Sequence, residues 1–322
     1  MKHQIFAFGT RFLLTLALPL LFVIGCDKDD DDAPPAGTTI TDLVVADANF
    51  STLEAAVVKA NLATTLSGDG PFAVFAPDDA AFTASGITSA TINTLTPAQL
   101  QAILLYHTLG SKILASDVPA GPNAKVVTAS GDSVFVTRNA SGVYINGIKV
   151  SQADINASNG VIHKIGRVLN PPAGTIVETA VASGLDSLVK AVTRATTAPG
   201  GDPSLAGTLG TATLTVFAPT NAAFTNLLSA LSLTNINDIP IATLLAVLRY
   251  HVVAGRAFSS DLANGSLAML AGGNTTINLT NGTGGAPTIT GTNNGGTSSN
   301  ITATNIICRN GVVHIIDKVL IP

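Results

Sequence analysis

The sequence predicts an α+β protein made of two tandem copies of one domain. Each copy is expected to place helices in its N-terminal half and a largely antiparallel β-sheet wedge after them. Residues 73–82 read AVFAPDDAAF, and residues 215–224 read the similar TVFAPTNAAF. A Tyr-His pair and an Asn-Gly-Val-x-His segment follow each copy in the same order. An ordered recurrence of this kind indicates a duplicated domain.

Each FAP motif predicts a buried strand followed directly by a helix. The β-branched and aromatic residues suit a strand, and Pro77 and Pro219 end it and can open a helix. The polar residues that follow, Asp78 and Thr220, are expected to cap these helices. The Asp-Asp pair of the first copy is Thr-Asn in the second, a change that capping tolerates and that shared acid–base catalysis would not.

The rest of the first copy changes from helical to β-rich patterns. Apolar spacing predicts a helix over residues 50–66, and Thr96, Pro97 and Gln99 predict the capped start of a second helix that runs to residue 106. Asn146-Gly147 predicts a type I′ hairpin turn. The expected strands cover residues 125–128, 133–137, 143–145, 148–150 and 161–169.

A Pro-Pro-Ala-Gly segment at residues 171–174 marks a short, stiff boundary between domains predicted at 38–170 and 173–322. Stiffness indicates domains that pack together or keep a limited range of angles. In the second copy, helices are expected near 176–195 and over 241–250.

The second copy is also predicted to carry two polar insertions, because matched positions move apart along the chain. The insertion at 196–213 is rich in Gly, Pro and Thr, and the one at 272–300 is almost all Gly, Thr, Asn and Ser. The latter predicts a long hairpin extension with a flexible tip at 293–299. It is either a ligand-contacting arm or, more simply, a tolerated surface loop.

Residues 1–25 are typical of an export signal. Lys2 and Arg11 precede an apolar run that is short for a membrane-spanning helix. The sequence VIGC at residues 23–26 resembles a bacterial lipobox, in which the cysteine, here Cys26, is lipidated. An uncleaved anchor with an incidental cysteine is the alternative, and either predicts an exported chain held to a membrane.

Residues 26–37 form an acidic tether that ends in a Pro/Ala/Gly segment. The tether is either only a spacer or a sorting signal. The second alternative arises because Lys-Asp-Asp after the cysteine resembles the surface-export signal of Bacteroidetes lipoproteins. We therefore expect a lipid anchor in the bacterial outer membrane, with surface exposure left open.

Charge argues against nucleic acid as a partner. The net charge of −4 becomes −6 when Lys2 and Arg11 are removed, and the tether's five Asp and one Lys leave about −2 on the domains. No basic excess remains to neutralise phosphates. Cys308 is the only cysteine besides Cys26, so with Cys26 lipidated we expect no disulfide within the chain and a buried Cys308 thiol.

The histidines are the candidates for metal or catalytic chemistry. His107 and His251 follow predicted helices, whereas His163 and His314 lie in aliphatic runs that favour buried, hydrogen-bonded rings. The sequence holds no HExxH, paired-cysteine, GxSxG or phosphate-loop pattern. We expect no catalytic residue, no metal site and no cofactor.

Together, the FAP motif with its polar pair, the Tyr-His and the NGV-x-H with its closing aliphatic strand resemble the fasciclin domain, in tandem over roughly residues 38–322. The resemblance implies an extracellular or membrane-tethered adhesion module that contacts proteins, matrix or glycans. The residues that match its structural signature are Phe75, Pro77, Phe217, Pro219, His163 and His314.

In eukaryotic fasciclin-like proteins the segment around the Tyr-His is implicated in receptor contact, and the matching segments here are residues 106–118 and 250–262. This implies possible partner-binding residues in both copies: Tyr106, His107, Asp117, Tyr250, His251 and Asp261. An envelope metal-binding or enzymatic protein that uses the Tyr-His region is the alternative. A scaffold that only spaces envelope components is a third hypothesis.

Overall fold

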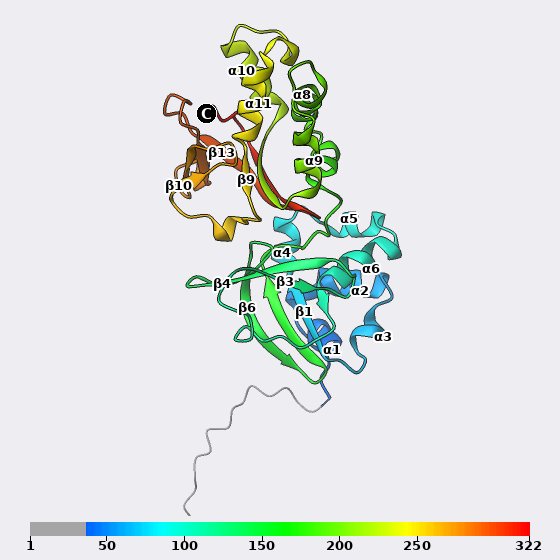
Figure 1. The fold of residues 1–322 in the computed structure, drawn as a ribbon. Coiled ribbons are helices and arrows are strands. Elements are labelled where there is room, and N and C mark those ends of the chain that lie inside the picture. Colours follow the sequence, from blue (N-terminus) through cyan, green and yellow to red (C-terminus); the bar gives the residue numbers. More distant parts are fainter. Residues whose placement is uncertain (1–36) are drawn as a thin grey trace, which may run out of the picture. The chain divides into compact units, whose positions relative to one another are not determined.

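In each of two similar domains of the computed structural model, which describes residues 37–322, one strand lies among the helices and most of the other strands follow them (Figure 1). Residues 37–322 lie within one compact unit. The predicted export signal, the lipidated Cys26 and the tether before Gly37 lie outside the described residues. Within residues 37–322, every helix is too short or too polar to cross a membrane.

The first domain begins with short helices around one early strand and ends with the remaining strands. Its helices are α1 (Ile40–Ala46), η1 (Ala48–Phe50), α2 (Ser51–Lys59), α3 (Ala63–Leu66), α4 (Asp79–Ala84), α5 (Ser89–Thr94) and α6 (Pro97–Tyr106). Its strands are β1 (Phe72–Pro77), β2 (Thr108–Leu109), β3 (Gly121–Val127), β4 (Ser133–Asn139), β5 (Gly142–Ile145), β6 (Ile148–Ala157) and β7 (Gly160–Ile165).

The second domain repeats this order. Its helices are α7 (Ile176–Ala182), α8 (Asp186–Thr197), α9 (Ser204–Thr211), α10 (Asn221–Ala230), η2 (Ile236–Asp238), α11 (Ile241–Arg249), η3 (Ser259–Asp261) and η4 (Thr283–Gly285). Its strands are β8 (Leu214–Pro219), β9 (Val252–Ala254), β10 (Gly265–Ala268), β11 (Asn274–Asn278), β12 (Thr288–Thr290), β13 (Ser299–Cys308) and β14 (Gly311–Ile316).

Each domain contains a seven-stranded mixed sheet with the same topology. The order is β2-β1-β7-β6-β5-β4-β3 in the first domain and β10-β11-β12-β13-β14-β8-β9 in the second. Only β1–β7 and β8–β14 are parallel among the pairs of the described residues. Their register sets Phe75 beside His163 and Phe217 beside His314. The FAP and NGV-x-H motifs, far apart in sequence, are therefore neighbours in the sheet.

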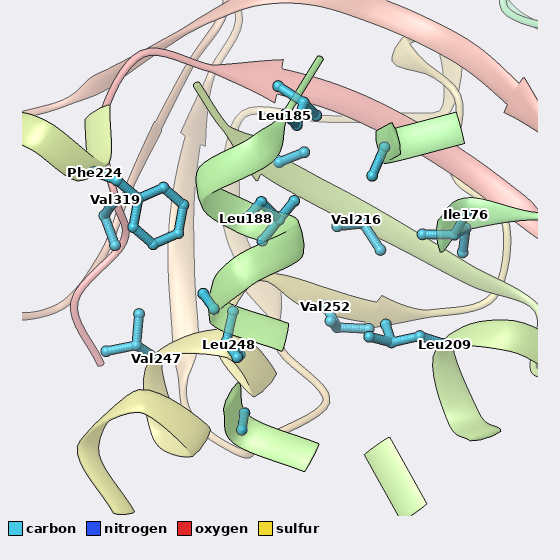
Figure 2. Close-up of a cluster of buried hydrophobic side chains, with 14 of the residues drawn as sticks. Ile176, Leu185, Leu188, Leu209, Val216, Phe224, Val247, Leu248, Val252 and Val319 are labelled. Carbon is cyan, nitrogen blue, oxygen red and sulfur yellow. The ribbon is translucent and has the colours of Figure 1, made fainter. Parts of the chain in front are cut away.

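The FAP strand is buried on both faces, which explains its continuous apolar run. Val74 and Ala76 belong to the core cluster beneath the helices, whereas Ala73 and Phe75 belong to the cluster on the sheet side. The second domain divides its core in the same way. Figure 2 shows its helix-side cluster, in which Val216 of β8 lies among side chains of α7, α8, α9 and α11.

Local sequence signals specify several elements correctly. The side chain of Thr96 accepts a hydrogen bond from Gln99 N, and Gln99 Oε1 accepts one from Thr96 N, so the predicted capping box of α6 is confirmed. Asp78 and Thr220 cap α4 and α10 as expected. The Asn146-Gly147 turn has positive φ at both residues, as a type I′ turn requires.

Two expected helices are each divided in two. The helix expected over residues 50–66 breaks between α2 and α3, where Asn61 adopts a φ of 56°. The helix expected near 176–195 breaks between α7 and α8, where Gly184 adopts a φ of 66°. Both residue types tolerate left-handed backbone, so the apolar stripe continues although the helix axis changes.

The expectation for residues 196–213 was wrong. This segment is not a polar insertion, because it contains α9, whose Leu205 and Leu209 are buried in the core. Asn310 donates to Leu209 O and Ala212 O, just as Asn159 donates to Leu66 O and Gly68 O. The segment is therefore a longer version of α3 in the first domain.

The expectation for residues 272–300 was right about a hairpin and wrong about its exposure. β11 and β12 pair antiparallel, as a hairpin requires. β11 and β12 are interior strands of the sheet and match β4 and β5, and their Ile277 and Ile289 are buried. The expected flexible tip at 293–299 is bonded to the C-terminal residues, since Asn294 accepts from Ile321 N and donates to Val319 O. Threonine alternating with isoleucine here marks a half-buried strand, not an exposed one.

Candidate partner-binding site

The Tyr-His pairs sit where the last long helix of each domain meets the sheet. Tyr106 ends α6, and its hydroxyl donates to Ser133 O at 3.0 Å and accepts from Asn146 Nδ2 at 3.0 Å. The Tyr250 hydroxyl is likewise bonded to Asn274 O. Both tyrosines are at most 1% exposed, and burial raises the pKa of Tyr106 to about 12. Neither phenol is available to a partner.

His107 and His251 use both ring nitrogens within their own domain. Leu169 N donates to His107 Nε2 at 2.9 Å, so the proton is on Nδ1, which donates to Ile103 O at 2.8 Å. His251 makes the same two bonds, to Leu320 N and Val247 O. Burial lowers the pKa of both rings to about 4. Neither nitrogen is free for a metal, which argues against the metal or catalytic alternative.

The NGV-x-H histidines hold the segment that follows each Tyr-His. His163 Nε2 donates to Ile113 O at 2.8 Å, and His314 Nε2 donates to Ala257 O at 2.9 Å. Each ring also packs on the FAP phenylalanine, with centroids 5.8 Å apart for Phe75 and 5.3 Å apart for Phe217. Burial lowers the pKa of both histidines, to about 4 for His314.

Asp117 and Asp261 close the same tight turn in the two domains. Asp117 Oδ2 accepts from Leu114 N at 2.9 Å, and Asp261 Oδ2 accepts from Phe258 N at 2.9 Å. The two carboxylates therefore fix backbone geometry, and Asp117 is exposed beyond that bond. The candidate residues thus divide into buried anchors, the Tyr-His pairs, and an accessible turn.

Sequence reasoning missed a further anchor of this turn. Asp154 Oδ1 accepts from Ala115 N at 2.9 Å, and Asn305 Oδ1 accepts from Ser259 N at 2.7 Å. Asp154 and Asn305 both have positive φ and lie next to bulges in β6 and β13. An Asp or Asn inside a strand pattern is the signal that could have indicated a bulge.

Comparison with known proteins bears on this repeated arrangement. The family model described as the fasciclin domain matches residues 48–171 and again residues 188–322. The chain belongs to the fasciclin family. It thus holds two fasciclin domains in tandem, as the sequence motifs implied.

Relatives of this fasciclin protein occur in bacteria and animals. The chain is 37% identical over 142 residues to protein sll1483 of Synechocystis sp., covering 44% of this chain and 77% of that protein. It is 39% identical over 140 residues to the transforming growth factor-beta-induced protein ig-h3 of Sus scrofa, covering 44% of this chain but only 20% of that protein. Human periostin is 30% identical over 138 residues, 42% of this chain and 16% of that protein.

Among solved structures, the fold is similar to a FAS1 domain pair from the insect cell adhesion molecule fasciclin I. That match has a TM-score of 0.38 and 16% identity, and it covers 88% of this chain and 96% of that chain.

The two fasciclin domains differ in what their turns contact. In the second domain, the Phe258 ring lies 6.1 Å from the Phe135 ring of the first domain, and the Arg256 guanidinium covers Phe135 at 4.1 Å. Thr137 Oγ1 donates to Asp261 Oδ1 at 3.1 Å across the same contact. The turn of the second fasciclin domain therefore docks on β4 of the first.

The turn of the first fasciclin domain is open by comparison. Lys112, Ser116 and Asp117 are exposed, and Lys112 Nζ donates only to Asn156 Oδ1, at 3.2 Å. Among the described residues, this turn makes no hydrogen bond to the second domain. The same framework thus presents one occupied turn and one accessible turn.

Metal-ligand geometry does not occur in the part of the fasciclin chain that the structure describes. No three His, Cys, Asp or Glu side chains of residues 37–322 gather as ligands would. Cys308 is buried, and its thiol bonds to Thr179 Oγ1 at 3.2 Å. The buried Cys308 expected from the sequence is confirmed.

Proposed function

We propose that this fasciclin protein is a non-catalytic adhesion or binding module, and that the first domain contacts its partner through residues 106–118. The main observation behind this proposal is the contact between the turn of the second domain and β4 of the first. Residues 256–261 of this turn contact the surface of the first domain, with Phe258 as the apolar centre and Asp261 as a polar contact, which supports a binding role for the equivalent turn. The first domain repeats the geometry and leaves it accessible.

The chemistry of the accessible turn indicates the kind of partner. Lys112 and Asp117 offer opposite charges a few residues apart, Ser116 offers a hydroxyl, and Leu114 is half-buried between them. Such a surface suits a polar partner with hydrogen-bonding groups and a small apolar contact. We therefore propose an extracellular or envelope protein or glycan as the partner, and no nucleic acid.

The side chains that could act as acids or bases form hydrogen bonds that hold the fold together, which supports a non-catalytic role. Asp79 accepts from Thr52 N and Ser51 Oγ, both at 2.8 Å, and Asp78 caps α4. The Tyr-His rings are committed to backbone partners as described above. These groups, which could have served proton transfer, thus fasten helices and loops to one another.

We further propose that the chain is exported and lipid-anchored through Cys26 to the bacterial outer membrane, with both domains on the cell surface. The lipobox-like VIGC and the acidic tether support this. A radiolabelled fatty acid fed to expressing cells should label the protein, and Cys26→Ser should remove the label. Protease added to intact cells should digest the domains. Resistance equal to that of a periplasmic marker would overturn surface exposure.

Partner binding is tested with the purified full chain. Labelled protein is incubated with intact cells of the bacterium that makes it, with extracellular matrix proteins and with a glycan array. Saturable binding that unlabelled protein competes away is expected on at least one of these surfaces. Background binding on all three surfaces would overturn the proposal.

A further inference from the structure

A surface-connected apolar cavity of about 100 Å³ lies inside the sheet wedge of the first domain. Side chains from β1–β7 and the 113–119 segment line it, and Phe75, Val118, Val126, Val136 and Ile145 are among them. Of the lining residues, Asp117 and Pro119 are exposed and Ala115 is half-buried. Solvent therefore reaches the cavity beside the turn.

The matching space of the second domain is lined by larger side chains at three positions. Val136 pairs with Ile145, and its counterpart Ile277 pairs with Ile289. Val126 lies opposite Val134 on β4, and its counterpart Leu267 lies opposite Thr275 on β11. Val118 and Leu262 each follow the capping aspartate directly.

The second domain therefore adds one methylene at each of these three positions. Leu262, Leu267 and Ile277 pack together in one core cluster with Met269, whose counterpart is Thr128. Two positions change in the other direction, from Leu109 to Val253 and from Ile113 to Ala257. These two changes remove four carbons from the second domain, whereas the three valine positions add three, so the two wedges differ in where the side-chain bulk lies and not in its total.

Two other apolar cavities occur at equivalent places in the two domains and therefore serve as a comparison. Each domain has one of about 80 Å³ in its helical half, beside His107 in the first domain and His251 in the second. Because the fold repeats this pair of cavities, they belong to the shared framework. The wedge cavity is instead lined by residues that differ between the domains, with Val118, Val126 and Val136 in place of Leu262, Leu267 and Ile277.

The polar atoms at the wedge cavity are already engaged. His163 donates from Nε2 to Ile113 O and accepts at Nδ1 from Asp154 N, and Asp117 accepts from Leu114 N. No lysine or arginine is among the lining residues. A ligand would therefore meet mainly apolar atoms, and an anion would find no lysine or arginine to offset its desolvation cost.

We propose that the wedge of the first domain binds a small neutral apolar molecule about the size of a single aromatic ring. The size argument is general: an engineered apolar cavity of about 150 Å³ stays dry and binds benzene or xenon. The opening beside residues 115–119 lets a ligand enter without unfolding the domain. The opening adjoins the turn proposed to contact the partner, because Leu114 and Asp117 belong to both.

Toluene titration of the full chain, followed by methyl NMR, tests the site directly. Saturable shifts are expected at the methyl groups of Val118, Val126 and Val136. Val57 and Val192, which line the two framework cavities, should not shift. Benzoate, which has a similar ring and a charge, should produce no saturable shift.

A variant built from the chain's own second domain supplies the matched control. Val118→Leu, Val126→Leu and Val136→Ile together should weaken toluene binding at least tenfold while leaving the melting temperature near that of the wild type. Absence of saturable shifts in the wild type up to the solubility of toluene would overturn the proposal. So would shifts centred on Val57 or Val192, or undiminished binding by the filled variant. If the variant does not fold, the location of the wild-type shifts decides.

Discussion

The Phe258 ring of the second domain packs at 6.1 Å and a 40° tilt against the Phe135 ring of the first domain. Phe258 is fully buried, and Arg256 covers the same Phe135 ring. Phe135 on β4 thus contacts two side chains, Arg256 and Phe258, from the same segment of the second domain. This contact distinguishes the two domains, because the positions that match Phe135 and Phe258 are Thr276 and Leu114.

Removal of the aromatic pair should uncouple the domains. Tilted aromatic pairs contribute about 0.5–1.5 kcal/mol beyond their buried area. We expect a coupling free energy of about that size between Phe135→Ala and Phe258→Leu in a double-mutant cycle, measured by urea unfolding of the full chain. Val127→Ala, a change at an exposed side chain of β3, should show no coupling to Phe258→Leu. Strict additivity of the Phe135 and Phe258 changes would show that the rings do not interact in solution.

The buried histidines should make stability depend on pH in a defined window. Burial lowers the pKa of His107, His251 and His314 from 6.5 to about 4. Between these values the unfolded chain binds more protons than the folded one. The stabilisation is therefore complete above about pH 6.5 and is lost as the pH falls toward 4. At pH 5 the loss should be about 2 kcal/mol for each ring.

Carboxylates affect stability at a lower pH than the histidines do, so the two contributions to the pH dependence can be separated. Backbone hydrogen bonds lower the pKa of Asp42 and Asp47 below 3.8, and the stability that these groups contribute is lost only as the pH falls below that value. Urea unfolding at pH 7.5, 6.0 and 5.0 therefore reports on the histidines. His107→Asn should reduce the slope by up to about 1.4 kcal/mol per pH unit. An unchanged free energy of unfolding between pH 7.5 and 5.0 would contradict the prediction.

Capping of the helix after each FAP motif should be measurable by substitution. Asp78 Oδ1 accepts from Ala81 N at 2.7 Å, and Asp78 Oδ2 lies 3.2 Å from Lys164 Nζ. Loss of a cap costs about 1 kcal/mol, whereas a solvent-screened ion pair contributes less. Asp78→Ala should therefore destabilise the first domain by about 1 kcal/mol, while Asp78→Asn, which keeps an acceptor oxygen, should cost only a few tenths. Equal losses in urea unfolding would assign the effect to the ion pair instead.

Local signals explain why much of the fold could be predicted from the sequence. The capping box at Thr96, the turn at Asn146-Gly147 and the apolar run of each FAP strand depend on neighbours within a few residues. Helix α9 could not be predicted in this way, and for strands β11 and β12 the pattern predicted a hairpin but not its burial inside the sheet. Their Gly, Thr and Asn residues favour loops, and they become regular because Leu209 and Ile277 pack against distant parts of the chain.

The candidate site shows the same limit. The sequence motifs led to the Tyr-His pairs, which are buried anchors, and to the aspartates of the turn. They did not reveal Arg256, Phe258 or Phe135, because that contact forms only when two domains meet. One signal was present: the alternation in β4 buries Val134 and Val136 and places the aromatic Phe135 on the opposite face.

The accessible turn of the first domain offers a charge test of partner binding. Lys112 is exposed and bonds only to Asn156 Oδ1, so Lys112→Glu should leave the fold intact. A charge at the edge of an interface contributes on the order of 1 kcal/mol, which corresponds to a five- to tenfold change in affinity. We expect Lys112→Glu to weaken cell-surface or glycan binding by about this factor. Lys190→Glu makes the same charge change on an exposed face of α8 and should have no effect. Equal weakening by both variants would indicate a non-specific response to net charge, and full binding by both would remove the turn from the interface.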